Sequence, residues 1–136
     1  MKRELFDRWI AALKSGEYEQ GCMYLCKNHP TTEKKRYCCL GILLELDGVL
    51  SKEPEMNGTY YVIDEKNPTI HNCASIPKFK CQEYGMDALG HPLDISNVTS
   101  NVTESLSRLN DKGTPFKDIA SFLEKNWQVY IKELTD

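Results

Sequence analysis

The sequence lacks the positive charge that DNA-binding and RNA-binding proteins usually carry. Its 136 residues include 17 lysines and arginines against 20 aspartates and glutamates, which gives a formal net charge of −3. Proteins that bind nucleic acid polymers usually show a basic excess, so we expect no DNA or RNA polymer as a partner. A small anionic ligand remains compatible with this charge, because two or three cations gathered in one place are enough to bind it.

Long apolar runs are also absent. A membrane-spanning helix needs about 20 consecutive apolar residues, and no segment approaches that length. The segment "MKRELFDRWIAALKSG" at residues 1–16 is amphipathic and carries acids, without the apolar stretch and cleavage site of a signal peptide. We therefore expect a cytoplasmic protein with no membrane partner, in which the six cysteines are thiols.

The motifs of familiar enzymes are missing. There is no glycine-rich phosphate loop, no zinc-protease motif and no Ser-His-Asp order. The three histidines, His29, His71 and His91, all lie in apparent loops, and no two carboxylates stand out as an acid and a base. These absences predict a binding protein rather than an enzyme, and nothing in the sequence requires a cofactor.

The sequence does contain two adjacent cysteines, Cys38 and Cys39, between a cationic run at 34–36 and an apolar run. Structural zinc sites use closely spaced cysteine pairs, and only Cys22 and Cys26 have such spacing, with Cys38 as a third ligand in the less favoured alternative. A nucleophilic thiol would need a base nearby. We favour a third interpretation, in which the adjacent cysteines are small buried residues where a strand meets a helix. We expect no metal site.

Apolar periodicity predicts the helices. Residues 3–15 carry one apolar stripe, and Gly16 suits the left-handed position that ends a helix. Residues 39–46 are apolar on nearly all sides, which predicts a buried central helix ended by Gly48. The other predicted helices are 102–110, a helix with Thr114 as N-cap and Pro115 as first residue, and a short helix from Pro77 to Gly85.

Alternating polar and apolar residues predict a hairpin. The stretch "EYEQGCMYLCKN" at 17–28 has the pattern of one strand, and "RYCC" at 36–39 is its predicted partner across a polar turn. A further strand is predicted at 59–64, inside a loop-rich and hairpin-rich insertion at 51–98. Together these elements predict a single α+β domain over 1–136, with helices at both ends and a buried central helix packed with a short antiparallel hairpin or sheet.

Several cationic and aromatic side chains would suit a nucleotide. Aromatic faces stack on bases, while cations and free backbone amides hold phosphates. The predicted ligand-binding residues of this kind are Lys35, Arg36, Tyr37, Tyr60 and Tyr61.

A second polar cluster surrounds a predicted turn at Asn110 and Asp111. Arg108 precedes this turn and is a further predicted ligand residue, and the helix N-terminus at Thr114 offers free amides to a phosphate. Asparagine and aspartate often accept hydrogen bonds from backbone amides within their own turn. We favour that capping role for the pair over a ligand contact, which stays open as the alternative.

Three segments of the chain follow a shared pattern. They are "WIAALKSGEYEQG" at 9–21, "RYCCLGILLEL" at 36–46 and "SLSRLNDKGTPFKDIASFLE" at 105–124. In this order they resemble a widespread group of small tailed-phage proteins. The chain also resembles the anti-CBASS nucleotide-sponge family, phage proteins that bind cyclic dinucleotide alarm signals and do not cleave them. The insertion at 51–98 carries no matching motif.

This resemblance implies a phage immune-evasion protein in the host bacterial cytoplasm. It would sequester a cyclic dinucleotide such as 3'3'-cGAMP and form a homo-oligomer, a tetramer in that family. The polar motif positions, which we take as the best candidates for the ligand site, are Tyr18, Gln20, Arg36, Asn110 and Asp111. Two alternatives stay open: an inhibitor that binds a host protein, and a hydrolase of the nucleotide signal built around Cys38, a histidine and Asp111.

Overall fold

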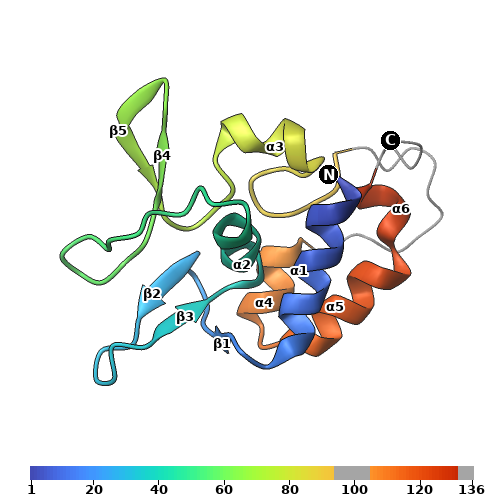
Figure 1. The fold of residues 1–136 in the computed structure, drawn as a ribbon, viewed down its shortest axis with the longest axis horizontal. Coiled ribbons are helices and arrows are strands. Elements are labelled where there is room, and N and C mark those ends of the chain that lie inside the picture. Colours follow the sequence, from blue (N-terminus) through green and yellow to red (C-terminus); the bar gives the residue numbers. More distant parts are fainter. Residues whose placement is uncertain (94–104, 132–136) are drawn as a thin grey trace.

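The computed structural model describes residues 1–93 and 105–131 of the chain. Helices carry most of the hydrophobic core, and two small sheets lie to one side of them (Figure 1). This combination makes the fold α+β, as the sequence predicts. Of the helices in the described part, none has the length and hydrophobicity that crossing a bilayer requires.

Helix α1 (Arg3–Ser15) packs against α2 (Cys39–Leu46) and α5 (Phe116–Lys125). Its apolar stripe is buried, and Trp9 is fully enclosed with its indole N–H donating to the Cys39 carbonyl at 2.8 Å. Gly16 adopts a φ of 76° and ends the helix, which confirms the prediction. The indole bond satisfies the one polar atom that the buried ring would otherwise leave unpaired.

Helix α2 is the buried centre of the fold, as its all-round apolar pattern predicts. Cys38 is its N-cap, and the Cys38 thiol accepts a hydrogen bond from the Gly41 amide at 3.3 Å. Cys39 is fully buried, with Sγ 3.5 Å from the Leu106 carbonyl oxygen. A Cβ built at Gly41 would lie 1.7 Å from the Leu25 carbonyl oxygen, so this turn of the helix must be glycine. The adjacent cysteines therefore form the strand-to-helix junction that the sequence suggested.

The first sheet contains three short strands in the order β1 (Glu19–Gln20), β3 (Lys35–Tyr37) and β2 (Cys26–Asn28). Strands β2 and β3 form the predicted antiparallel hairpin, while β1 runs parallel to β3. The prediction of one continuous strand over 17–28 is wrong. Met23 has a φ of 71° and its side chain is 69% exposed, so the chain turns out of the sheet between β1 and β2.

Helix α4 (Leu106–Asp111) begins after Ser105, whose hydroxyl accepts from the Arg108 amide at 3.1 Å. Residues 102–104 of the predicted helix lie outside the described residues. A short helix, α6 (Trp127–Tyr130), follows α5.

The predicted start of helix α5 is wrong by one residue. Pro115, not Thr114, is the N-cap, with an extended ψ of 150°, and the helix begins at Phe116. The physical reason is that the amides of Asp118 and Ile119 both donate to the Pro115 carbonyl, while the Thr114 carbonyl accepts from the Gln20 side chain.

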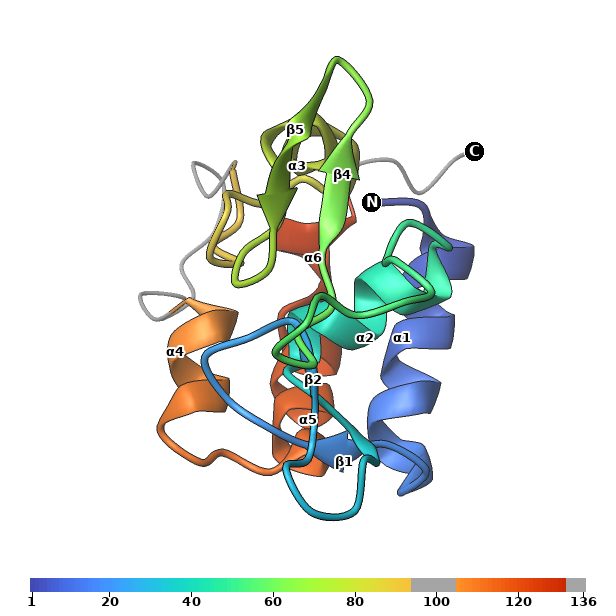
Figure 2. The same cartoon turned by 90° about the vertical axis from the view of Figure 1, so that its left-hand side faces the viewer.

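The middle of the chain forms a second sheet, the two-stranded hairpin of β4 (Val62–Asp64) and β5 (Asn67–Asn72). This hairpin stands away from the helices (Figures 1 and 2). Only the second half of the strand predicted at 59–64 is regular. Thr59 instead makes a single bridge to Lys27 on β2, which ties the base of the hairpin to the first sheet.

Helix α3 (Lys78–Tyr84) follows the hairpin. As predicted, it ends at Gly85, where φ is 69°. Pro77 is its N-cap rather than its first helical residue, because ψ at Pro77 is 147°. Tyr84 is fully buried, and its hydroxyl donates to the Asp47 carboxylate at 2.5 Å. Hence part of the insertion belongs to the core, whereas the hairpin does not.

Candidate functional site

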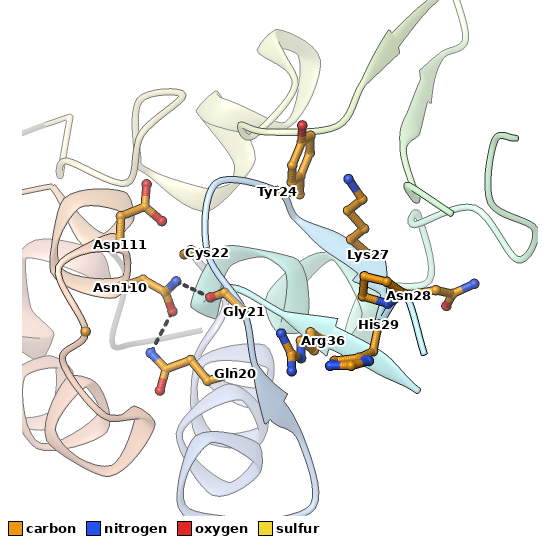
Figure 3. Close-up of a pocket in the computed structure, with 12 residues that line it drawn as sticks. Gln20, Gly21, Cys22, Tyr24, Lys27, Asn28, His29, Arg36, Asn110 and Asp111 are labelled. Carbon is orange, nitrogen blue, oxygen red and sulfur yellow. Dashed lines mark hydrogen bonds between the residues drawn. The ribbon is translucent and has the colours of Figure 1, made fainter. Parts of the chain in front are cut away.

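A pocket of about 540 Å³ lies between the β2–β3 hairpin and the turn that joins α4 to α5. The loop from β1 to β2 forms its floor, and Figure 3 shows side chains from all three segments around it. The residues that line it are Gln20, Gly21, Cys22, Tyr24, Lys27, Asn28, His29, Pro30, Arg36, Asn110, Asp111 and Gly113. Its volume falls within the range of pockets that bind small molecules.

Four of the predicted site residues meet in this pocket: Gln20, Arg36, Asn110 and Asp111. They come from β1, β3 and the end of α4, and each of the three motif segments contributes at least one. No simple spacing rule brings residues 20, 36 and 110 together. The polar positions of the three motifs are thus neighbours in space, although they are spread along the chain.

Asn110 holds these segments in place. It is 2% exposed, and its side-chain oxygen accepts from the Gln20 side chain at 3.0 Å and from the Cys39 amide at 3.1 Å. Its side-chain NH₂ donates to the Gly21 carbonyl at 2.7 Å (Figure 3). Because these bonds join β1, the start of α2 and the end of α4, Asn110 fixes the wall of the pocket.

Asp111 holds the floor. Its Oδ1 accepts from the Met23 amide at 2.9 Å, at the residue whose left-handed φ breaks the strand. We predicted that Asn110 and Asp111 cap amides of their own turn. They do accept from backbone amides, but across the pocket and from distant segments, so the location of their partners was wrong. Whether either residue also contacts a ligand stays a prediction.

Two cationic residues lie on neighbouring strands on the sheet side of the pocket. Lys27 and Arg36 are directly opposite in the β2–β3 register, which places both side chains on the same face. Like charges in this position destabilise a sheet unless something compensates them. Glu19 pairs with Arg36 through Oε1 and Nε at 3.1 Å, and this leaves the terminal nitrogens of the guanidinium for another partner. The pair is suited to an anion.

Aromatic and neutral polar groups complete the lining. The Lys27 ammonium lies 4.5 Å from the centre of the Tyr24 ring, which is a cation–π contact. The His29 Nδ1 accepts from the amides of Thr31 and Thr32, so the neutral imidazole carries its proton on Nε2. Gly21 allows the chain after β1 to pass close to β3, because a Cβ at this position would lie 2.9 Å from the Arg36 Cβ.

The comparison with protein families identifies the family of this chain. A family model described as a domain of unknown function, DUF8296, matches residues 1–127. The chain belongs to the DUF8296 family. The match includes the three motif segments and all the pocket residues. No curated protein and no solved structure matches the chain.

The other predicted site residues of this DUF8296 member lie elsewhere. Tyr18, Lys35 and Tyr37 line a separate hollow of about 630 Å³ on the other side of β1, where the two rings meet edge to face at 5.2 Å. Tyr60 is 5% exposed and lies beneath the Lys35 ammonium. Burial limits what Tyr60 can offer a ligand.

The last two of these residues lie farther along the chain. Tyr61 stacks on His71 in the hairpin, with ring centres 4.4 Å apart. Arg108 is exposed on α4 and does not line the pocket. The structure therefore separates the predicted residues into a pocket group and several groups away from it.

Sequence reasoning missed eight of the residues that line the pocket, among them Cys22, Tyr24, Lys27 and His29. Lys27 and Tyr24 lie in the stretch that was taken for one regular strand. A correct hairpin register would have placed Lys27 opposite Arg36, and that pairing is the signal that could have found it.

The thiols of this region differ in burial. Burial raises the pKa of Cys38 to about 11 and that of Cys26 to about 12, and burial also raises the pKa of Cys39. Cys22 is exposed at the pocket. Within residues 1–93 and 105–131, no three histidine, cysteine, aspartate or glutamate side chains are grouped as metal ligands would be.

Proposed function

We propose that this pocket binds a cyclic dinucleotide such as 3'3'-cGAMP, and that the protein sequesters the signal in the cytoplasm of an infected bacterium. A phage would thereby block CBASS-type defence. The observation that carries the proposal is the convergence of Gln20, Arg36, Asn110 and Asp111 from three motif segments into one pocket with an opposed pair of cations. The resemblance of those segments to small tailed-phage proteins, and of the chain to the anti-CBASS sponge family, supports the same reading.

The charge of the pocket supports an anionic ligand. Lys27 and Arg36 are paired across β2 and β3, and two phosphates would neutralise the two cations. Glu19 holds the guanidinium of Arg36 at Nε. The terminal nitrogens can then donate two parallel hydrogen bonds to one phosphate, the geometry in which arginine binds this group best.

The apolar part of the pocket supports a ligand that also has a base. The Tyr24 ring offers a π face, and Pro30 and Cys22 also line the pocket. Stacking of a base on an aromatic side chain contributes about 1–3 kcal/mol. A free phosphate would bind the cations and leave this apolar surface in contact with water. A nucleotide would contact both the cations and the apolar surface.

Sequestration is better supported than hydrolysis. The hydrolase alternative depends on Cys38, which is buried, and its thiol accepts a hydrogen bond from the Gly41 amide. A thiol with a pKa of about 11 is almost entirely protonated at neutral pH and is a poor nucleophile. The exposed Cys22 lies at the pocket, and recovery of intact ligand tests its involvement.

The affinity that a sponge needs supports assembly into a homo-oligomer. Nanomolar binding corresponds to about −12 kcal/mol, and two cations with one ring are few contacts for that. A site completed by a second copy would supply the rest, and a tetramer is the form implied by the resemblance. Light scattering on the purified protein, with and without ligand, measures this state.

A thermal-shift panel tests the function. The protein is heated with cyclic dinucleotides, cyclic trinucleotides and cyclic ADP-ribose isomers, and a ligand at 1,000 times its Kd stabilises the fold by about 4 kcal/mol. We expect a large shift with cyclic dinucleotides and recovery of the intact nucleotide from the heated protein. Degraded nucleotide would support the hydrolase instead.

Variants place the binding in the pocket. Arg36→Ala and Lys27→Ala should each abolish most of the shift. Lys66→Ala removes the same charge from the exposed turn between β4 and β5, and it should leave the shift intact. If all three variants behave alike, the pocket is not the site. A flat panel for the unmodified protein contradicts the proposal and favours an inhibitor of a host protein.

A further inference from the structure

Among the described residues that line the pocket, Asp111 is the one with an acidic side chain. It lies on the wall opposite Lys27 and Arg36. In Figure 3 the Asp111 carboxylate and the Tyr24 ring stand on different sides of the pocket, with Arg36 below them. The salt bridges formed by residues 1–93 and 105–131 do not include Asp111, although Arg36 has one with Glu19. The pocket is therefore basic on one wall and acidic on the other.

The geometry of Asp111 leaves acceptor capacity for a ligand. Its Oδ1 accepts one hydrogen bond, from the Met23 amide, and within the described residues no donor is bonded to Oδ2. A carboxylate has about four acceptor sites and no donor. A ligand that fills this wall must therefore present N–H or O–H groups, and one that presents a lone pair is repelled.

The two purines differ at this point. The pairing edge of guanine carries two adjacent donors, N1–H and N2–H, whose spacing matches the two oxygens of a carboxylate. Adenine presents the N1 lone pair beside a single amino group, and the lone pair would face an anion. Oδ1 can accept from guanine and still hold Met23, because each carboxylate oxygen has two lone pairs.

We propose that Asp111 recognises the pairing edge of guanine, so that the pocket selects guanine-containing cyclic dinucleotides over those with adenine alone. This inference rests on the proposed function and adds base selectivity to it. Lys27 and Arg36 hold the phosphates, Tyr24 stacks on the base, and Asp111 reads its edge. Hydrogen bonds to a charged group contribute enough for a preference of about ten- to a hundredfold.

Isothermal titration calorimetry of the full chain tests this with cyclic di-GMP, 3'3'-cGAMP, cyclic di-AMP and the hypoxanthine analogue cyclic di-IMP. We expect the guanine ligands to bind about ten- to a hundredfold more tightly than cyclic di-AMP. Cyclic di-IMP lacks N2–H and should bind with intermediate affinity. Equal affinity for cyclic di-GMP and cyclic di-AMP overturns the inference.

Asp111→Asn is the decisive variant, because it keeps an oxygen for the Met23 amide and replaces the other with a donor. We expect at least a tenfold loss of cyclic di-GMP affinity with unchanged or improved binding of cyclic di-AMP. Asp118→Asn, on the exposed face of α5, removes the same charge outside the pocket and should change neither. An unchanged guanine preference in Asp111→Asn, with an unchanged melting temperature, overturns the role of Asp111.

The two proposals fail in different ways. Tight binding of every cyclic dinucleotide without base preference leaves the sponge function intact and removes the guanine reading alone. Absence of binding by all four nucleotides overturns both. A lower melting temperature in Asp111→Asn together with an unchanged guanine preference would leave the carboxylate only the structural role of holding Met23, and it too counts against the inference.

Discussion

The helical body, defined as α1, α2, α4 and α5 with the three-stranded sheet, and the β4–β5 hairpin are held in different ways. Helix α2 is buried along almost its whole length, and Asn110 joins three segments of the body by hydrogen bonds. In the hairpin, five of the six residues of β5 are exposed, Ile70 among them, and so is Ile63 on β4. A two-stranded hairpin is at best marginally stable by itself, so we infer that the body holds it.

This difference also separates the candidate site from the hairpin. The pocket is built entirely from the body, at the point where its polar side chains are most constrained. The hairpin contributes no pocket residue, and its own polar contacts are local: Tyr61 stacks on His71, whose ring is 2.6 Å from Glu55. A ligand site needs fixed side chains, and the body provides them.

The largest expected effect comes from Gly41, where the body is most tightly packed. Gly41→Ala places a Cβ 1.7 Å from the Leu25 carbonyl oxygen, so helix and strand must separate. We expect a loss of about 3–5 kcal/mol in the free energy of unfolding, enough to unfold a domain of ordinary stability. Urea denaturation followed by the fluorescence of the buried Trp9 measures it.

Gly16→Ala is the matched control for this prediction. Gly16 has a φ of 76° and nothing within 4 Å of the added Cβ, so the change introduces backbone strain without a clash. It should cost about 1 kcal/mol. Equal losses in the two variants would show that the contact between α2 and the Leu25 carbonyl does not limit the packing of the body.

The second effect concerns the bonds that hold the pocket wall. Asn110→Ala leaves the buried Cys39 amide and the Gly21 carbonyl without their partner, and it should cost about 2–4 kcal/mol. Asp111→Ala removes a single exposed bond to Met23 and should cost less than about 1 kcal/mol. The two neighbours thereby separate a structural role from a ligand role, and similar losses in both would contradict that division. Chemical denaturation measures both.

The same contrast explains what could be predicted from the sequence. The helices at 3–15 and 39–46 were predictable because burial of their apolar side chains fixes them locally. The end of the first helix was predictable because Gly16 readily adopts the positive φ found there. The interruption at Met23 was not predictable from alternation, since it depends on the Asp111 carboxylate at the far end of the chain.

The residues of the candidate site also divide into those that the sequence predicted and those that it did not. Its motif residues were found by their polarity among apolar neighbours, as with Gln20 and Arg36. Lys27 was missed because its direction depends on the hairpin register, which the turn between the strands sets. Tyr24 was missed because it lies in the irregular loop between β1 and β2, where alternation does not apply. Tyr60 and Tyr61 were expected at the site and lie apart from it, because alternation in a short strand does not say which face the body covers.

A smaller effect tests the part of the insertion that does join the core. The Asp87 carboxylate accepts from the amides of Leu89 and His91 and contacts the His91 ring at 3.1 Å. Burial would raise the pKa of Asp87, but these hydrogen bonds and the nearby imidazole outweigh it and lower the pKa. A lowered pKa in the folded state adds stability above pH ~4, and the gain is lost as pH falls through the folded value.

We therefore expect Asp87→Asn to be less stable than the unmodified protein near pH 6, with a difference that shrinks toward pH 3. Urea denaturation at several pH values measures it. A difference that grows as the pH falls would contradict the sign derived from Asp87.

The smallest effect is expected in the hairpin. Ile63→Thr and Ile70→Thr act on side chains that are 42% and 44% exposed, and each should change the free energy of unfolding by less than about 0.5 kcal/mol. Val62→Thr is the matched control one residue along β4, where the side chain is fully buried and a hydroxyl should cost about 1–3 kcal/mol. Denaturation curves at two protein concentrations complete the test. A cost at Ile63 that equals the cost at Val62 and depends on concentration would mean that a second copy of the chain covers the hairpin. The hairpin would then have a structural role that the contacts of a single chain do not provide.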